Sequence, residues 1–215
     1  MLTNNHIDFL EKNTVFYNKL SNEEKEIVTT NSYTVKFPSG KILLSGDDKC
    51  SGFIIVISGC LRVFISSPDG KEITLYKLLQ GDSCIFSASC IFNNVNFNVN
   101  IEALEDTEVI ILPSNQLDIL SKGNPLIKEY ILQLTQSKMS EVMWLLEQIL
   151  FTSFDERLKN YLLEFDSNVI NITHNSIAKD LGTAREVVSR MLKHFENQGL
   201  IRLSRGSIEI INLGG

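Results

Sequence analysis

Polar side chains that donate hydrogen bonds recur at helical spacing near the C-terminal end of the sequence. Within LGTAREVVSRMLKHFENQGLI (181–201), Arg185, Ser189 and Lys193 are four residues apart, and Arg190 follows Ser189. In a helix of 3.6 residues per turn these positions share one face. The planar guanidinium of arginine donates to two acceptors at once, such as O6 and N7 of guanine. The spacing therefore predicts a helix face suited to nucleic acid.

The opposite face of the same segment is apolar. Its side chains recur at i, i+4 and i+8 and should form a buried stripe. The residues of this stripe are Val187, Val188, Met191, Leu192 and Phe195.

Glu186 also falls on the predicted polar face, and its side chain has three interpretations. Its carboxylate suits the exocyclic amino group of cytosine. It can instead close a capping box with Thr183, three residues earlier. It can also form an ion pair with Arg190 at i, i+4. The sequence leaves all three open.

The segment before this helix predicts a helix-turn-helix. HNSIAKDL (174–181) is typical of a helix capped by Thr173, and Gly182 should break it before the second helix begins. The segment thus predicts two helices joined by a glycine-containing turn, with an arginine near the start of the second. This arrangement places a recognition helix in the major groove.

A hairpin with further basic residues should follow the recognition helix. LIRLSRGSIEII (200–211) predicts two strands that turn at Arg205-Gly206. This hairpin would form a wing, from which Arg202 and Arg205 reach phosphates.

Charge is distributed unevenly along the chain, whose net charge is -6. Residues 1–150 hold 12 basic and 18 acidic residues, and residues 151–215 hold 8 of each. Within 170–207 there are 6 basic and 3 acidic residues, a local net of +3. The basic residues therefore concentrate around the predicted helix-turn-helix, as expected of an electrostatic footprint for nucleic acid.

The N-terminal half predicts helices followed by short strands. Residues 7–31 suit two short helices, the second with a capping box of Ser21 and Glu24. From about residue 33 the segments FIIVISG, CLRVFIS, EITLYKL and NVNIEAL are rich in β-branched and aromatic residues. Glycines at 59, 70 and 81 recur every 11 residues, which favours antiparallel strands in a sandwich or barrel.

A long helix is predicted over about 125–150, with Pro125 in its first turn. One stripe along it is spaced 3, 4, 3, 4, 3 and is apolar except at one threonine, which is a heptad seam. The seam consists of Leu132, Thr135, Met139, Val142, Leu146 and Ile149. Such a stripe can be buried within its own domain, but after an all-β domain we favour pairing with the same helix of a second copy.

Composition places the chain among soluble globular proteins with two modest domains. No apolar run approaches the roughly 20 residues of a membrane span, and MLTNNHIDFLEKN lacks the features of a signal peptide. We therefore expect a cytoplasmic protein with no membrane partner, whose four cysteines are reduced thiols.

The segment GTAREVVSRMLKHFENQGLI resembles the recognition segment of the Crp/Fnr transcription regulators, and the likeness extends over most of the chain. The glycine turns in ISG, PDGKE and LLQGD are similar to those of the family's effector-binding β-roll, and residues 151–157 to its hinge. The resemblance implies that Arg185, Glu186 and Arg190 read bases. It places Thr173, His174 and Ser189 near the DNA backbone.

The resemblance implies an α+β fold with three parts. An N-terminal antiparallel β-roll, jelly-roll in type and cyclic-nucleotide-binding-like, spans 1–123 and senses the effector. A long dimerisation helix and hinge span 124–152. A C-terminal winged helix-turn-helix spans 153–215 and binds DNA.

The sequence departs from the nucleotide-binding members of this family where they hold the ribose and the cyclic phosphate. Ile85 and Phe86 stand where those members have Gly-Glu, and no Arg or Lys occurs between Lys77 and Lys122. A buried phosphate without a cation would be costly, so cyclic AMP is not the expected effector. The candidate effector pocket is apolar and consists of Val63, Leu78, Ile85, Phe86, Val142 and Met143.

The cysteines lie only in the β-region, at 50, 60, 84 and 90. The oxygen-sensing branch of the family holds an iron–sulfur cluster on N-terminal cysteines, and the spacing of Cys84 and Cys90 is not that of a cluster. We favour small apolar core residues. A redox, metal or haem sensor that uses Cys84, Cys90 or the ligands His6, Met139 and Met143 is the alternative, so the cofactor stays unknown and no metal site is assigned.

Three classes of function can be compared. We expect an effector-controlled transcription regulator, a homodimer whose partners are a double-stranded DNA operator, RNA polymerase and a small-molecule effector. A module whose helix-turn-helix docks on protein should carry exposed apolar anchors, which the polar face over 185–193 lacks. No catalytic residues are predicted, because the sequence has only three histidines and lacks a phosphate loop or a HExxH motif. The effector, the operator and the choice between activation and repression are not encoded in any motif.

Overall fold

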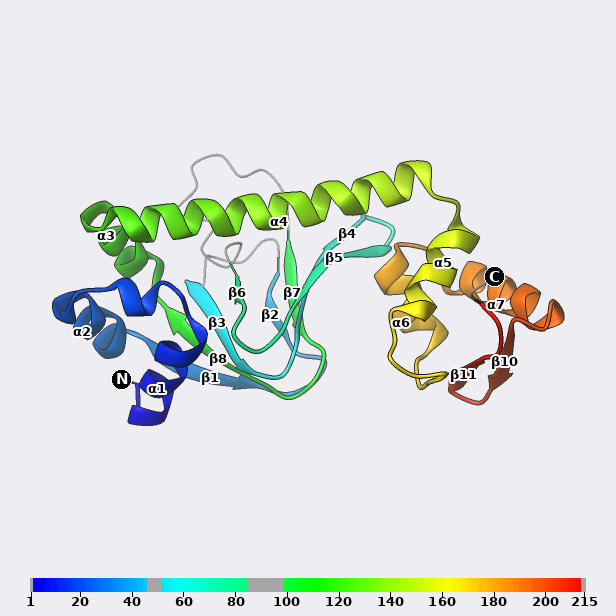
Figure 1. The fold of residues 1–215 in the computed structure, drawn as a ribbon, viewed down its shortest axis with the longest axis horizontal. Coiled ribbons are helices and arrows are strands. Elements are labelled where there is room, and N and C mark those ends of the chain that lie inside the picture. Colours follow the sequence, from blue (N-terminus) through cyan, green and yellow to red (C-terminus); the bar gives the residue numbers. More distant parts are fainter. Residues whose placement is uncertain (1, 46–51, 85–98, 214–215) are drawn as a thin grey trace. The chain divides into compact units, whose positions relative to one another are not determined.

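The computed structural model describes residues 2–45, 52–84 and 99–213. The chain forms two compact units (Figure 1). One comprises Met1–Phe64 and Leu75–Glu141, and the other comprises Ile65–Thr74 and Val142–Gly215.

The first unit begins with helices. These are α1 (Asn4–Asn13), the 3-10 turn η1 (Tyr17–Lys19) and α2 (Asn22–Asn31). The predicted capping box of α2 is confirmed: the backbone N–H of Glu24 donates to Ser21 Oγ at 3.2 Å, and the Ser21 N–H donates to the Glu24 carboxylate at 2.8 Å.

Two four-stranded antiparallel sheets follow, with strand orders β1-β8-β3-β6 and β2-β7-β4-β5 among the described residues. The strands are β1 (Tyr33–Phe37), β2 (Ile42–Leu44), β3 (Phe53–Ser58), β4 (Leu61–Ser66), β5 (Glu72–Leu78), β6 (Ser83–Cys84), β7 (Asn100–Ala103) and β8 (Thr107–Leu112). Strands distant in sequence pair with one another, as β1 does with β8, and Figure 1 shows the sheets curved into a roll. The antiparallel β-roll predicted from the sequence is confirmed.

A buried ion pair links two strands of the second sheet. Arg62 on β4 is 1% exposed and lies opposite Glu102 on β7, with Nη1 3.2 Å from the carboxylate. The guanidinium also stacks over the Phe64 ring, 4.1 Å from its centroid. The sequence pattern did not predict this charge in the core.

The next helices along the chain are α3 (Ser114–Gly123) and α4 (Pro125–Phe151). Helix α3 and the part of α4 up to Glu141 belong to the first unit. The first turns of α4 pack on the roll through the buried side chains Ile127 and Ile131. The ring of Tyr130 lies 5.1 Å from that of Phe16, and its hydroxyl bonds with Ser83 Oγ at 3.2 Å.

The seam positions of α4 lie on its surface. Leu132 is 57% exposed, Met139 64% and Leu146 45%, and Ile149 is also exposed. Thr135 and Val142 are half-buried. Large apolar side chains in solvent along one helix are unusual in a monomer and typical of an interaction surface.

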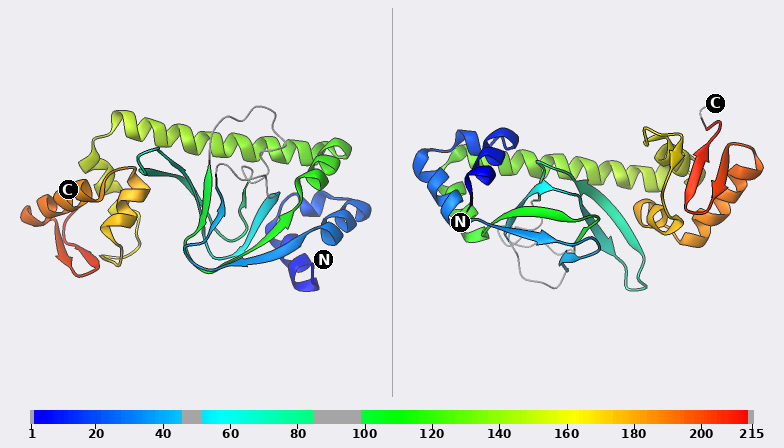
Figure 2. Two further views of the ribbon diagram at one scale, coloured as in Figure 1. Left: turned by 180° about the vertical axis from the view of Figure 1, so that it is seen from behind. Right: turned by 90° about the horizontal axis from the view of Figure 1, so that it is seen from below.

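The C-terminal part of the second unit is a three-helix domain with a small sheet (Figure 2). Its elements are α5 (Phe154–Leu163), β9 (Val169–Ile170), α6 (His174–Leu181), α7 (Arg185–Asn197), β10 (Ile201–Ser204) and β11 (Ser207–Ile210). The sheet has the order β10-β11-β9, and the β10–β11 hairpin turns at Arg205-Gly206 as predicted. The winged helix-turn-helix is therefore confirmed. No helix within the described ranges has the length and apolarity to cross a membrane.

Candidate nucleic-acid interface

The turn between α6 and α7 is built from local signals in the sequence. Thr173 caps α6, since its Oγ1 accepts from the Ser176 N–H at 3.0 Å. Gly182 ends α6 with φ at +64°, a left-handed conformation that a side chain disfavours. The Thr183 N–H donates to the Ala178 carbonyl at 2.9 Å, which satisfies a carbonyl of the last turn.

The start of α7 corrects one interpretation of Glu186. The N-cap is Ala184, which makes no side-chain cap, so Thr183 and Glu186 do not form a capping box. Glu186 is exposed in the first turn of α7. The ion pair with Arg190 is also absent among the described residues.

The buried stripe of α7 is narrower than the sequence indicated. Val188, Leu192 and Phe195 are buried in the core of this domain, with α5 residues Leu158 and Leu162. Val187 and Met191 are only half-buried. These two side chains border a surface pocket together with Arg190 and His194.

The basic side chains around α7 differ in whether a carboxylate neutralises them. Lys193 pairs with Glu196 at 2.6 Å, and Arg202 pairs with Glu209 at 2.9 Å. The hydrogen bond from Lys193, with a second from the Leu203 N–H, lowers the pKa of Glu196.

The arginines of α7 keep their charge uncompensated. Arg185 and Arg190 are exposed, and neither makes an ion pair within the described part of the chain. Because no partner must be displaced, their guanidinium groups are available to an external acceptor.

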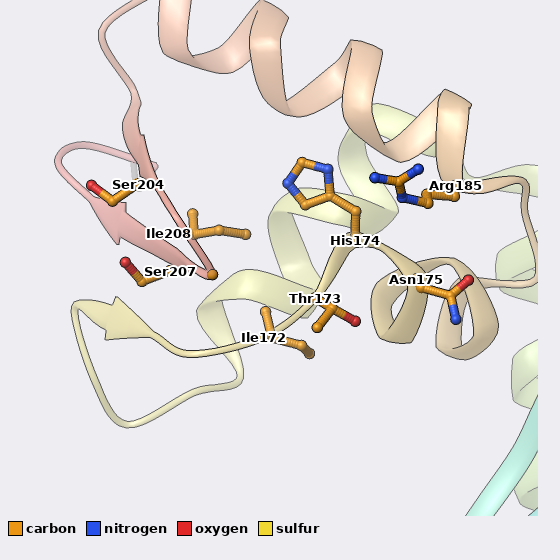
Figure 3. A pocket seen from close by; sticks show the side chains of 9 residues that line it. Ile172, Thr173, His174, Asn175, Arg185, Ser204, Ser207 and Ile208 are labelled. Atoms are coloured by element: carbon orange, nitrogen blue, oxygen red, sulfur yellow. The ribbon is translucent and has the colours of Figure 1, made fainter.

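The start of α6, the start of α7 and the wing enclose a pocket of about 300 Å³ (Figure 3). It is lined by Ile172, Thr173, His174, Asn175, Arg185, Ser204, Gly206, Ser207 and Ile208. Figure 3 shows the His174 ring beside the Arg185 side chain, across from Ser204 and Ser207 on the wing. Thr173 and Arg205 are exposed.

Ser189 is not a free polar side chain. It is half-buried, donates from Oγ to the Arg185 carbonyl at 3.0 Å, and lies 2.8 Å from Nδ1 of His174. Its hydroxyl therefore connects α7 to α6, in addition to any contact that it makes with DNA.

Two residues that position α6 carried no sequence signal. The Tyr161 hydroxyl on α5 donates to the Asp180 carboxylate at 2.7 Å, and Arg157 donates to the Leu181 carbonyl at 3.1 Å. Burial, together with the charge of Asp180, raises the pKa of Tyr161. These bonds hold the C-terminal end of α6, where the turn to α7 begins.

The residues of the predicted effector pocket are divided between the two units. Val63 and Leu78 are fully buried in the first unit, Val142 and Met143 belong to the second, and Ile85 and Phe86 lie outside the described residues. Val142 is half-buried and Met143 is exposed.

The described residues do not group into a metal site. No cluster of three or more His, Cys, Asp or Glu side chains occurs within those ranges. His6 Nδ1 is engaged with Thr3 Oγ1 at 3.1 Å. Met139 is exposed, and Cys90 falls outside the described residues.

Cys84 lies inside the β-roll. It is 0% exposed, and it pairs with Ile54 across strands β6 and β3. Cys60 is also buried.

We predict that Cys84 resists alkylation in the native protein. Because the thiol is buried, a reagent reaches it only when the structure around it opens. Each 1.4 kcal/mol of opening free energy slows labelling tenfold, so we expect labelling at least about 100-fold slower than in denaturant. Iodoacetamide labelling followed by peptide mass spectrometry measures it. If Cys84 is labelled as fast in the native protein as in denaturant, the alternative role of Cys84 as a sensor residue is favoured instead.

Comparison with known families agrees with both parts of this description. Residues 34–124 match the family described as cyclic nucleotide-binding domain, and residues 156–215 match the Crp-like helix-turn-helix domain.

Relatives that match most of this chain include a regulator of transcription. The chain is 26% identical over 203 residues, 93% of each protein, to the cyclic AMP receptor protein of Thermus thermophilus. It is 25% identical over 184 residues, 80% of this chain and 74% of the relative, to the transcriptional activator protein anr of Pseudomonas aeruginosa. A crystal structure of a transcriptional regulator of the Crp/Fnr family from Eubacterium rectale superposes with a TM-score of 0.89, at 39% identity over 94% of this chain and 95% of that one.

Proposed function

The chain belongs to the Crp/Fnr family of transcription regulators, and on this premise we propose that it binds a two-fold symmetric DNA operator as an effector-controlled homodimer. The observation that carries the proposal is the exposed face of α7, where Arg185 and Arg190 have no carboxylate partner among the described residues. We propose that the protein acts in the cytoplasm and that RNA polymerase is a further binding partner.

We assign base reading to the first two turns of α7. Arg185 and Arg190 would donate to guanine, and the exposed carboxylate of Glu186 would accept from cytosine. The absence of a capping box at the start of α7 supports this role for Glu186, because its side chain is not used to cap the helix.

The remaining residues of the interface would contact the DNA backbone. Positively charged side chains there add affinity without reading sequence. We assign this role to Thr173, His174, Ser189, Lys193, Arg202 and Arg205. Lys193 and Arg202 would exchange an intramolecular carboxylate for a phosphate when they bind.

We infer that the long helix provides the dimer interface. The exposed side chains Leu132, Met139, Leu146 and Ile149 are all apolar and follow heptad spacing. Two copies of this stripe, packed around a two-fold axis, remove it from water and place two recognition helices in adjacent major grooves.

We propose that the effector is apolar and is not a cyclic nucleotide. Arg62, the one fully buried guanidinium of the described β-roll, is already bound to Glu102. The segment between Lys77 and Lys122 adds no cation that could bind a phosphate. An apolar molecule in the domain over 1–123 would favour one arrangement of the helices over 124–152 and, through the hinge, the DNA-competent state of 153–215.

Selection from a random DNA pool tests the function. The expected result is enrichment of a palindrome whose half-sites are about one helical turn apart, because the half-site spacing follows the two-fold axis of the protein. Enrichment must depend on the polar face of α7, so a variant with both Arg185→Ala and Arg190→Ala is the matched control. A pool that stays unenriched in every effector state, or a single asymmetric half-site bound by a stable monomer, would overturn the proposal.

A further inference from the structure

The pocket between α6, α7 and the wing contains a histidine, His174, with one ring nitrogen hydrogen-bonded to Ser189. Ser189 Oγ has one hydrogen, which it donates to the Arg185 carbonyl. With its hydrogen on that carbonyl, the hydroxyl accepts at its 2.8 Å contact with His174, and from this geometry we assign a proton to Nδ1. Nε2 is left as the nitrogen that can gain or lose a proton.

Nε2 of His174 is available to an external group. No hydrogen bond formed by the described residues uses this nitrogen. The neutral side chains that line the pocket with His174 are Thr173 at the N-cap of α6, Asn175 in α6, and Ser204 and Ser207 of the wing. When neutral, Nε2 is an acceptor and repels a phosphate oxygen. When protonated, it is a cationic donor.

Burial and a neighbouring cation favour the neutral form of His174 in the free protein. Arg185, on α7, is the other lining residue that can carry charge, and among the described residues no carboxylate lines the pocket. Burial and the nearby Arg185 guanidinium both lower the pKa of His174 from its ordinary value of 6.5. A phosphate placed between Arg185 and His174 would instead favour protonation of His174, because its negative charge attracts the imidazolium.

Building on the proposed operator binding, we propose that His174 binds a DNA phosphate as the doubly protonated imidazolium, so that each half-site takes up one proton. The proton comes from solvent and stays on Nε2, which donates it to a phosphate oxygen. The negative charge of the phosphate offsets the repulsion between Arg185 and the protonated His174. Arg185 can then reach a base from the same pocket.

The direction of the pH dependence follows from the two states of the ring. The pKa of His174 is lowered in the free protein and raised in the complex, so the gain in affinity is present at low pH and is lost as pH rises through the pKa of the complex. Between the two pKa values the logarithm of the association constant should fall by about one per pH unit for each histidine engaged, and by up to about two for a dimer.

Titration of operator binding tests the inference. Fluorescence anisotropy with the selected operator, from pH 5.5 to 8.5 at constant ionic strength, should show the slope for the wild-type dimer. His174→Gln keeps a polar side chain without a titratable proton, so its slope should be flat. The matched control His194→Gln removes a histidine from α7 outside this pocket and should retain the wild-type slope.

A direct measurement keeps the inference testable if a variant is unstable. NMR of the His174 ring in the wild-type protein should show its pKa rising when operator is added. A His174→Gln protein that is folded and keeps the wild-type slope, or a ring pKa that does not move on binding, would refute the inference while leaving operator binding intact. A wild-type protein that binds no operator at any pH overturns the proposed function and this inference with it.

Discussion

Met139→Glu should convert the dimer into a monomer, with a dimer dissociation constant raised at least about 100-fold. Met139 is 64% exposed in the single chain, so the substitution leaves the monomer core intact. In the proposed dimer the two residues face one another across the axis, and two carboxylates would be buried as like charges. Each costs several kcal/mol to desolvate, and 1.4 kcal/mol corresponds to a factor of ten.

Sedimentation velocity over a range of concentrations measures the effect on the dimer. Ser137→Glu is the matched control, since Ser137 is an exposed residue of the same helix, about 200° around it from Met139. It adds the same charge outside the seam and should leave the dimer unchanged. A Met139→Glu protein that stays dimeric at nanomolar concentration would exclude α4 as the interface.

Arg185→Ala should remove the preference for one base in each half-site. A bidentate arginine–guanine pair gives about 1–3 kcal/mol of discrimination, so a dimer with two such pairs loses about 2–6 kcal/mol when the effects add. The loss should be confined to the operator, with little change in binding to unrelated DNA. Competition between the selected operator and versions with each base replaced would show which position becomes indifferent.

Lys193→Ala provides the contrast with Arg185→Ala. A residue that contacts phosphate should weaken binding to all sequences alike and reduce the dependence of affinity on salt. The effect should be modest, because Lys193 gives up its 2.6 Å pair with Glu196 to reach DNA. If Arg185→Ala instead weakens all sequences equally and leaves the base preference intact, base reading by Arg185 is wrong.

Features encoded within one or two helical turns could be predicted from the sequence. The Thr173 cap, the break at Gly182 and the turn at Arg205-Gly206 are local, and each is found where the sequence placed it. The length of α4 followed from its periodicity. These signals sufficed for the winged helix-turn-helix because its elements follow one another directly along the chain.

Contacts between distant side chains could not be predicted in the same way. Tyr161 and Asp180 are 19 residues apart, and His174 and Ser189 are 15 apart. Neither pair has a period or motif, since only the folded arrangement of α5, α6 and α7 brings them together. Glu186 shows that a local spacing can also mislead: α7 begins after Ala184, so Thr183 and Glu186 do not form the capping box that their spacing suggested.

The pairing of Arg62 with Glu102 has a consequence for how the β-roll assembles. A slip of two residues in the register between β4 and β7 would keep every side chain on its own face of the sheet. The burial of the apolar side chains Leu61 and Val63 would therefore change little, and it would not oppose the slip. Arg62 would then face Asn100 or Leu104 instead of Glu102. A guanidinium buried without its carboxylate is strongly unfavourable, so this one pair distinguishes the native strand register from its nearest alternatives during folding.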